Sequence, residues 1–325
     1  MPEMTMLQAI NDALHVAMAK DDSVVCLGED IGKKGGVFGT TAGLHEKYGE
    51  MRVMDTPLSE CGILGTAAGM ALYGLRAVPE IQFLDFIYPG FDQIVSEIAK
   101  FRYRSGGEYP CPVVIRAPSG GGIKGGHYHS QSSETYFIHT AGLRVVMPST
   151  PSDAKGMLLA SIFQGDPVMF MEPKALYRHA KEEVASGYYE TSLEKARLVH
   201  AGTDVTLVSW GAMVVTCEAA VKLAAEKGRS VELIDLRALL PWDAEAVLAS
   251  VRKTGRLVIA QEAPRTLGFA SEIAATAAEK AIDSLRAPVA RVSGFDTPFP
   301  YTLEHIYKPD ATRVLNAIEF VAKYD

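Results

Sequence analysis

Glu60 is the residue whose type and setting first suggest chemistry. It ends the segment DTPLSE (residues 55–60) and precedes a Gly- and Ala-rich run. The Thr-Pro step predicts an extended segment, and the small residues after Glu60 predict a helix that packs closely against another helix. A carboxylate in the first turn of such a helix either complements the helix dipole or acts at a site where the chain turns inward. Glu60 alone does not separate these two interpretations.

A glycine-rich stretch with two histidines forms a second candidate site. Residues 119–126 contain five glycines, and the motif HYHSQ (residues 127–131) follows at once. This pattern suits a solvated loop, a metal pair, or a loop that places one imidazole at an active site. If the loop is extended, His127 and His129 point the same way and could share a metal, but no third ligand is evident nearby.

Two further segments follow predicted strands. Residues 28–36 look like a phosphate loop but do not fit the pattern, because only three residues separate Gly28 from Gly32 and Lys34 stands where Ser or Thr would ligate Mg²⁺. We expect a mobile surface or interface loop there. The aromatic stretch QFLDFIY (residues 82–88) is either core packing or one wall of a cofactor pocket beyond a strand end.

Strands and helices alternate around these residues. Thr5 and Gln8 form a capping box for a first helix. Short apolar runs bounded by Gly or Pro are typical of buried parallel strands, and helical patterns lie between them. We expect strands at residues 24–27, 77–83, 112–116, 143–147 and 168–171. Helices are expected at residues 62–75 and 91–103, and after a start signal at residues 150–153.

The sequence turns polar and loses its periodicity between residues 174 and 202, and a second βα series follows. Its predicted strands are residues 205–209, 231–235, 257–260 and 289–292. The fold class is therefore α/β with two parallel-sheet domains. We place them at residues 1–185 and 204–325, joined by a linker at residues 186–203.

Composition narrows the classes of function. The 325 residues are enough for two domains with cores of their own. A net charge of −7 without long blocks of like charge argues against a nucleic-acid or acidic-membrane surface. No apolar run reaches the roughly 18 residues of a membrane span. The four cysteines are too widely spaced for a CxxC or zinc motif and favour reduced core thiols. We expect a soluble intracellular protein whose partners are small molecules and other proteins.

Several longer motifs carry a family resemblance. Three of these motifs, DTPLSE, QFLDF and HSQ, belong to the segments described above. The others are FMEPK, IDLR, LPWD, GFASE and GFDTPFP, which begin at residues 170, 234, 240, 268 and 294. Essentially end to end, they resemble the β subunit of the E1 component of 2-oxoacid dehydrogenase complexes. The branched-chain type is nearest and the pyruvate type is close. The resemblance implies a thiamine-diphosphate pyrimidine-binding domain followed by a transketolase C-terminal-like domain.

The resemblance also implies roles for individual residues. Glu60 would hydrogen-bond N1′ of the cofactor's aminopyrimidine, while Leu58, Gln82 and Phe86 would line the pyrimidine pocket. His129 would face the reacting centre, so Glu60 and His129 are the expected catalytic residues. The cofactor's own imino base forms only when N1′ is protonated or strongly hydrogen-bonded. A carboxyl group desolvated by neighbours such as Leu58 and Phe86 could supply that proton.

The sequence lacks half of such a site. Thiamine enzymes hold the diphosphate and Mg²⁺ with a Gly-Asp-Gly segment that ends in Asn-Asn, and only Gly165-Asp166-Pro167 comes close here. The resemblance assigns these ligands to an α subunit, which implies an α₂β₂ heterotetramer sharing thiamine diphosphate. No metal ligand is expected on this chain, although some family β subunits bind a structural K⁺ through backbone carbonyls.

The expected function is oxidative decarboxylation of a branched-chain 2-oxo acid and reductive acylation of a lipoyl group on an E2 acyltransferase. In this family the C-terminal domain of β contacts E2, which points to residues 294–325. A pyruvate or acetoin dehydrogenase β subunit, a self-sufficient transketolase-like enzyme and a non-catalytic assembly subunit are the alternatives. The expected compartment is the cytoplasm, or the mitochondrial matrix for the mature form of a eukaryotic protein.

Overall fold

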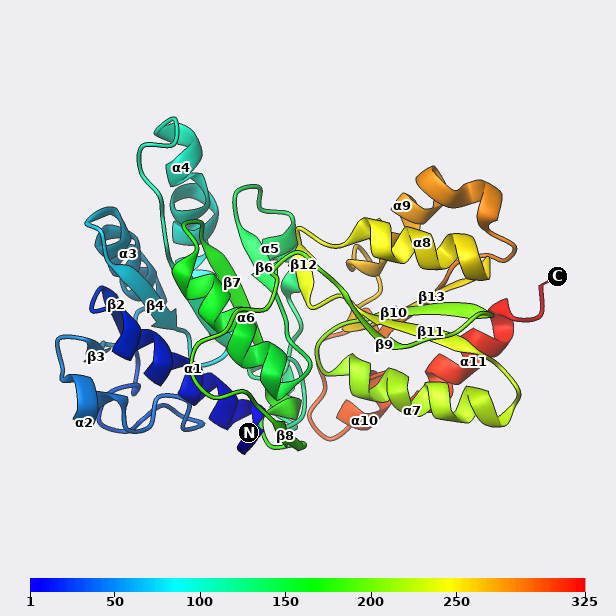
Figure 1. The fold of residues 1–325 in the computed structure, drawn as a ribbon, viewed down its shortest axis with the longest axis horizontal. Coiled ribbons are helices and arrows are strands. Elements are labelled where there is room, and N and C mark those ends of the chain that lie inside the picture. The colour runs from blue at the N-terminus through cyan, green and yellow to red at the C-terminus, as the bar shows by residue number, and fades with distance from the viewer. Residues whose placement is uncertain (325) are drawn as a thin grey trace. The chain divides into compact units, whose positions relative to one another are not determined.

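The computed structural model describes residues 1–324, and the chain divides into two compact units (Figure 1). The first unit comprises Met1–Ser119 and Tyr136–Leu193. The second comprises Gly120–Thr135 and the chain from Glu194 onward. The glycine-rich stretch with the two histidines therefore belongs to the second unit, although the chain on both sides of it belongs to the first.

A buried parallel sheet forms the centre of the first unit (Figure 1). Its strands follow the order β6-β7-β5-β4-β2-β3, and each neighbouring pair runs parallel. All residues of β2, β5 and β7 are buried, as expected for strands covered on both faces. The bounds are β2 (Val24–Gly28), β3 (Val53–Asp55), β4 (Arg76–Glu80), β5 (Val114–Ser119), β6 (Arg144–Val146) and β7 (Val168–Pro173). The predicted parallel-sheet class of this domain is confirmed.

Local capping signals set the helices of the first unit. The Thr5 backbone N donates to Gln8 Oε1 at 2.9 Å and the Gln8 backbone N donates to Thr5 Oγ1 at 3.3 Å, which confirms the predicted capping box. Thr150 caps the helix that begins at Pro151, also as predicted. The helices are α1 (Met6–Lys20), α2 (Leu44–Tyr48), α3 (Glu60–Leu72), α4 (Phe101–Arg104) and α6 (Pro151–Phe163), with α5 (Glu134–Ile138) at the unit boundary. A short antiparallel pair joins β1 (Glu3–Thr5) to β8 (Lys181–Glu183).

The helix predicted at residues 91–103 is present, but its pitch changes along its length. After the 3₁₀ turns η1 (Leu84–Phe86) and η2 (Tyr88–Gly90), the chain forms a π turn η3 (Gln93–Glu97), a 3₁₀ turn η4 (Ile98–Lys100) and α4. A Cβ added to Gly90 would lie 2.5 Å from Leu64 Cδ1 and 2.9 Å from Glu60 O, so this segment passes directly against α3. Apolar periodicity alone does not distinguish these helix types.

The second unit is a smaller α/β layer structure. Its sheet order is β14-β13-β10-β11-β9, with β9 antiparallel to β11 and the other pairs parallel. In Figure 1, α7 and α11 cover one face and α8 and α9 the other. The strands are β9 (Arg197–His200), β10 (Val205–Ser209), β11 (Val231–Asp235), β13 (Leu257–Pro264) and β14 (Ala290–Gly294), with β12 (Ala238–Leu240) outside this sheet. The helices are α7 (Met213–Glu226), α8 (Ala244–Thr254), α9 (Ala270–Ala281), α10 (Glu304–Tyr307) and α11 (Ala311–Val321). Strand β9 was not predicted.

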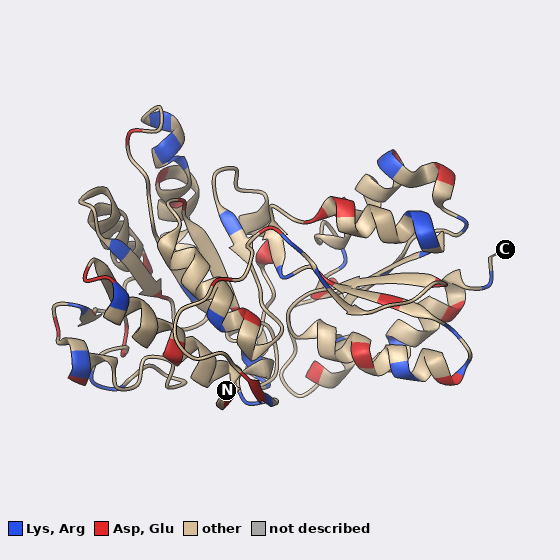
Figure 2. Ribbon diagram, viewed as in Figure 1, with Lys and Arg blue, Asp and Glu red and all other residues tan. Residues whose placement is uncertain are grey.

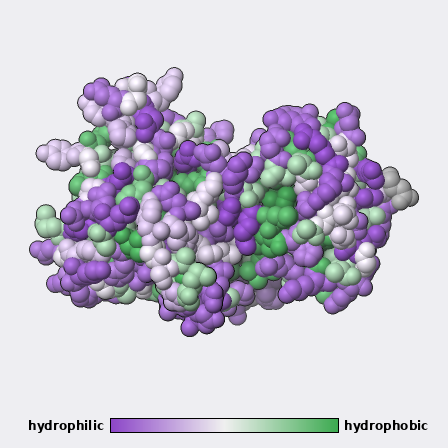
Figure 3. All heavy atoms as spheres, viewed as in Figure 1, coloured by the Kyte–Doolittle hydropathy of each residue, from purple (hydrophilic) through white to green (hydrophobic). Residues whose placement is uncertain are grey.

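The charged residues coloured in Figure 2 are distributed without a large patch of one sign, as the charge pattern of the sequence predicts. Charges of both signs are spread over the ribbon in Figure 2, and the face drawn in Figure 3 is mainly hydrophilic. Among residues 1–324, no helix has the length and apolar character needed to cross a membrane.

Burial raises the pKa values of the Cys26, Cys111 and Cys217 thiols to about 12. The expectation of core thiols is wrong for Cys61, which is exposed on α3.

Candidate active site

Glu60 is the first residue of α3, but the helix does not need it as a cap. Ser59 Oγ already accepts a hydrogen bond of 3.3 Å from the Gly62 backbone N. The Glu60 carboxylate is half-buried, and within residues 1–324 no side chain forms a hydrogen bond or ion pair with it. It does influence Glu29: burial raises the pKa of Glu29, and the negative charges of Asp30 and Glu60 raise it further. An unpaired carboxylate near a second one is typical of a functional site.

Gln82 and the loop at residues 28–36 lie at the same edge of the first sheet. Gln82 Nε2 is 3.5 Å from the Glu29 carbonyl oxygen and 3.5 Å from Asp30 Oδ2. Strands β2 and β4 are parallel neighbours, so the residues that follow them meet at one edge. The Asp55 carboxylate accepts a hydrogen bond of 2.6 Å from the Gly32 backbone N. The loop expected to be mobile is therefore tied to the end of β3.

Phe86 stands at the rim of an aromatic cluster. Its ring centroid is 5.5 Å from that of Phe83 in a T-shaped arrangement, and Phe83 is 5.5 Å from Phe38. Phe83 is buried and Phe86 is half-buried, so part of the Phe86 ring stays accessible. Leu58, just before α3, is 72 % exposed. The apolar enclosure expected around Glu60 is thus incomplete in this chain.

A buried ion network, missed by the sequence reasoning, crosses the strands that lead to this edge. Arg116 on β5 donates from Nη1 to Glu80 Oε2 and from Nε to Glu172 Oε1, both at 2.7 Å. Thr40 Oγ1 donates to Glu80 Oε2 at 3.0 Å, and Tyr177 donates its hydroxyl to Glu172. Glu80 ends β4, two residues before Gln82. Charged residues within or at the ends of the apolar predicted strands were the available sequence sign of this network.

His127 and His129 lie in a tight turn, not in an extended loop. The turn η5 (Gly126–Tyr128) is a 3₁₀ helix, and His129 follows it. Side chains two apart on such a turn point in different directions, so the geometry needed for a histidine metal pair is missing. Within residues 1–324, no group of three or more His, Cys, Asp or Glu residues is placed to hold a metal ion. Both histidines are half-buried, so burial does not separate their roles.

The structure places the expected site residues in both units. Leu58, Glu60, Gln82 and Phe86 belong to the first unit, where Glu60 and Gln82 both approach residues 29–30. His129 belongs to the second unit. There the sequence reasoning missed Glu134, a buried residue of α5 whose pKa burial raises to about 7.

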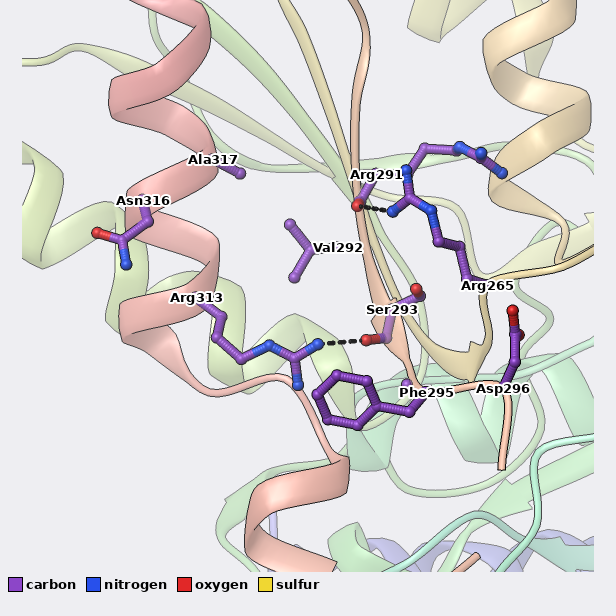
Figure 4. Close-up of a pocket in the computed structure, with 10 residues that line it drawn as sticks. Arg265, Arg291, Val292, Ser293, Phe295, Asp296, Arg313, Asn316 and Ala317 are labelled. Atoms are coloured by element: carbon purple, nitrogen blue, oxygen red, sulfur yellow. Dashed lines mark hydrogen bonds between the residues drawn. The ribbon is translucent and has the colours of Figure 1, made fainter. Parts of the chain in front are cut away.

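A groove with a volume of about 450 Å³ lies in the second unit, and Figure 4 draws the residues that line it. Arg265 Nη1 donates to the Arg291 carbonyl oxygen at 2.8 Å, and Arg313 Nη2 donates to the Ser293 carbonyl oxygen at 2.6 Å. Asp296 adds a negative charge, and the other lining residues are uncharged and include Val292, Phe295, Asn316 and Ala317. Most of this groove lies within residues 294–325, which the resemblance assigned to E2 docking.

Comparison with known proteins agrees with the fold. Residues 2–180 match the transketolase pyrimidine binding domain, and residues 194–314 match the transketolase C-terminal domain. A solved structure described as "Split gene transketolase, inactive beta4 tetramer" superimposes with a TM-score of 0.81 over 99% of both chains at 22% identity, which shows a shared fold. The predicted fold class is confirmed.

Relatives of similar length are much closer in sequence. The chain is 53% identical to "2-oxoisovalerate dehydrogenase subunit beta, mitochondrial" of Dictyostelium discoideum, over 99% of this chain and 87% of the relative. It is 48% identical to "2-oxoisovalerate dehydrogenase subunit beta" of Pseudomonas aeruginosa, over 96% of this chain and 93% of the relative. It is 50% identical to "Pyruvate dehydrogenase E1 component subunit beta" of Leifsonia xyli, over 97% of this chain and 93% of the relative. The chain belongs to the family of β subunits of 2-oxoacid dehydrogenase E1 components.

Proposed function

We propose that this chain is the β subunit of a thiamine-diphosphate-dependent dehydrogenase for branched-chain 2-oxo acids. Together with an α subunit it would decarboxylate the 2-oxo acid oxidatively and acylate the lipoyl group of an E2 acyltransferase. The observation that carries this proposal is the half-buried Glu60 carboxylate, which has no partner within residues 1–324 and begins a helix that Ser59 already caps. A pyruvate dehydrogenase β subunit is the second candidate, because the Leifsonia relative is 50% identical.

The residues of the first unit fit one end of thiamine diphosphate. An aminopyrimidine needs a carboxyl group at its ring nitrogen and apolar surfaces on its faces. Glu60 offers the carboxyl group, Phe86 a half-buried ring and Leu58 an exposed apolar side chain. When bound, the cofactor supplies a carbon nucleophile and an electron sink for decarboxylation.

Each residue then has a defined task. Glu60 would hold a proton at the pyrimidine nitrogen N1′, while Gln82 and Phe86 would orient the ring. Leu58 would help to exclude water once a second subunit covers it. His129 would hold or move a proton at the reacting substrate. The diphosphate and Mg²⁺ ligands would come from the α subunit, since the sequence has no Gly-Asp-Gly segment.

The exposed side of α3 supports assembly with a partner subunit. From Cys61 to Leu72 the helix has no charged residue, and its ribbon is tan there in Figure 2. Cys61, Thr66 and Gly69 are exposed on this side, and Tyr73 just after the helix is 91 % exposed. An uncharged face of small residues beside Glu60 suits close approach of another subunit. The proposed assembly is α₂β₂, with the cofactor shared between α and β.

Reconstitution with a candidate α subunit tests this function. The chain alone, with thiamine diphosphate and Mg²⁺, should turn over no 2-oxo acid, while the assembled enzyme should decarboxylate branched-chain substrates faster than pyruvate. Release of CO₂ from a panel of 2-oxo acids measures both statements. Decarboxylation by the isolated chain would contradict the half-site argument, and a preference for pyruvate would favour the second candidate.

We also propose that E2 docks on residues 294–325. The groove in Figure 4 gives this segment a concave surface with charges of both signs and the exposed ring of Phe295. Removing residues 322–325 should weaken E2 binding, measured by calorimetry, while decarboxylation by the E1 assembly stays largely intact. Unchanged E2 affinity after this deletion would contradict the docking assignment.

The division between Leu193 and Glu194 supports a linker at residues 186–203 between domains at 1–185 and 204–325. We also propose that backbone carbonyls of the assembled enzyme bind a structural K⁺. Metal analysis of the assembled enzyme tests this proposal. Relatives include mitochondrial and bacterial proteins, so we propose the mitochondrial matrix or the cytoplasm according to the source organism.

A further inference from the structure

Two carboxylates of the second unit bind consecutive parts of the glycine-rich loop that precedes His129. Glu262 lies near the C-terminal end of β13. Its Oε1 accepts a hydrogen bond of 2.6 Å from the Gly121 backbone N. Glu304, the first residue of α10, uses both oxygens: Oε1 accepts from Gly122 N at 2.7 Å and Oε2 accepts from Lys124 N at 2.8 Å. Three backbone N–H groups within four residues are therefore held by side chains far away in the sequence.

The glycines in this loop make room for these contacts. A Cβ added to Gly121 would lie 3.0 Å from Glu304 Oε1 and 2.9 Å from Phe299 Cζ. A Cβ added to Gly126, whose φ is +62°, would lie 2.3 Å from the Tyr301 ring. The glycine-rich pattern thus reflects a loop pressed against residues 299–304 and not a free linker.

The carboxylates are suited to hold a loop in place. Glu262 and Glu304 are 7 % and 8 % exposed, and hydrogen bonds from N–H groups to a buried carboxylate are short and strong. Lys308 Nζ lies 3.6 Å from Glu262 Oε2, and Ser132 Oγ donates to Glu262 Oε1 at 3.4 Å. Glu262 therefore contacts the loop on both sides of His129.

A short link connects the bound part of the loop to the histidine. The Gly125 backbone N donates to Ser130 Oγ at 3.1 Å, and the turn η5 lies between these two residues. A Cβ on Gly125 would lie 2.5 Å from the His129 Cβ, so the backbone at Gly125 contacts the histidine closely. Displacement of the loop at Lys124 would therefore move His129.

We infer that Glu262 and Glu304 are positioning residues that fix the His129 imidazole for the reaction. The inference rests on the proposed function of His129, but the hold on the loop is measurable without turnover. Glu304 is the stronger test because each of its two oxygens accepts a backbone N–H. In Glu304→Gln one of these acceptors becomes an NH₂ group that faces another donor. Glu262→Gln keeps an oxygen that can accept from Gly121, and the acceptor that it loses faces Lys308 Nζ rather than the loop backbone, so its effect on the loop should be smaller.

Loop order is measured first, on the full-length chain. Lys124 is exposed, so trypsin cleavage after it reports how often the loop opens. Cleavage should be about tenfold faster in Glu304→Gln, with a smaller increase in Glu262→Gln. The His129 ring signal in NMR spectra, assigned with His129→Gln, should shift or broaden in the same order. Glu279→Gln, an exposed change on α9, is the matched control and should change neither measurement.

Activity of the reconstituted E1 separates positioning from simple stability. In Glu304→Gln, kcat should fall about tenfold while KM for the 2-oxo acid and the melting temperature stay near those of wild type. Unchanged cleavage and an unchanged His129 signal would overturn the inference. A freed loop with unchanged kcat would overturn it too, if His129→Ala is inactive. If His129→Ala is itself active, the proposed role of His129 fails instead, and the loop measurements alone decide whether the carboxylates hold the loop. Should Glu304→Gln not fold, Glu262→Gln provides the same test.

Discussion

The indole Nε1 of Trp210 donates a hydrogen bond of 3.2 Å to Oε1 of Glu134, and both side chains are buried. Burial raises the pKa of Glu134 to about 7, although the bond from Trp210 lowers it, and the negative charge of Glu262 adds to the increase. Within residues 1–324, the second oxygen, Oε2, is buried without a hydrogen-bond partner. Glu134 therefore changes its charge near neutral pH inside the second unit.

This titration predicts a stability that depends on pH. The folded chain binds the Glu134 proton more tightly than the unfolded chain, whose carboxyl has a pKa of 4.5. Proton binding by Glu134 stabilises the folded chain fully below pH 4.5, and this contribution is lost as the pH rises through about 7. The free energy of unfolding should fall by up to about 3 kcal/mol over this range. Urea unfolding between pH 5 and pH 8, followed by tryptophan fluorescence, measures this loss.

The control for the pH prediction is Glu134→Gln, which cannot titrate. The difference in free energy of unfolding between wild type and this variant should change with pH across the same window. Both tryptophans, Trp210 and Trp242, lie in the second unit, so the fluorescence reports on that unit. Parallel pH curves for the two proteins would show that Glu134 does not titrate there.

The buried network around Arg116 predicts a large loss of stability. Arg116→Met leaves Glu80 and Glu172 buried without their shared cation. The free energy of unfolding should fall by about 3–5 kcal/mol. The matched change is Arg104→Met, which breaks an ion pair of 2.7 Å to Glu97 between partly exposed side chains and should cost less than about 1 kcal/mol. Equal losses in urea unfolding would contradict this view of the network.

Much of the fold could be predicted because its signals are local. The predicted strand at residues 231–235 coincides with β11, and Thr150 caps α6 as its sequence suggested. Strand β9 was missed because it has four residues whose exposure alternates at a sheet edge, and such a segment resembles a polar linker.

The site could be predicted only in part. Glu60 and His129 stand in local motifs, so the sequence singled them out. Glu262 and Glu304 act on backbone atoms of residues 141 and 182 positions away, and the sequence around them shows no sign of that contact. The metal-pair alternative for the histidines depended on an extended loop, and only the folded chain shows the turn that replaces it.

The two histidines should differ strongly in their effect on catalysis. His129→Ala should lower activity of the assembled enzyme by roughly 10²–10⁴, the range for removal of one acid–base group, with little change in stability. His127 packs its ring 4.1 Å from Tyr128 and 6.0 Å from Tyr301, so His127→Ala should mainly loosen the turn. Steady-state kinetics beside thermal unfolding compares them. Equal losses of activity would favour a role of the whole loop over a role of one imidazole.

Glu60→Gln distinguishes a helix-dipole role from a catalytic role. If Glu60 only complements the dipole of α3, the change should cost about 0.3–1 kcal/mol of stability and leave turnover nearly intact. Glu272→Gln, at an exposed position in the first turn of α9, measures that effect alone.

If Glu60 holds a proton at the pyrimidine nitrogen, the variant should fold as well as wild type or better, since Gln keeps the shape and removes a negative charge near Glu29. Turnover of the reconstituted enzyme at saturating cofactor should nevertheless fall at least about a hundredfold, which corresponds to roughly 2.7 kcal/mol of transition-state stabilisation. The dipole role thus predicts a lower melting temperature, and the catalytic role predicts an unchanged or higher one together with a much lower rate. A Glu60→Gln enzyme within a few-fold of wild-type turnover would exclude the catalytic role, whatever its melting temperature.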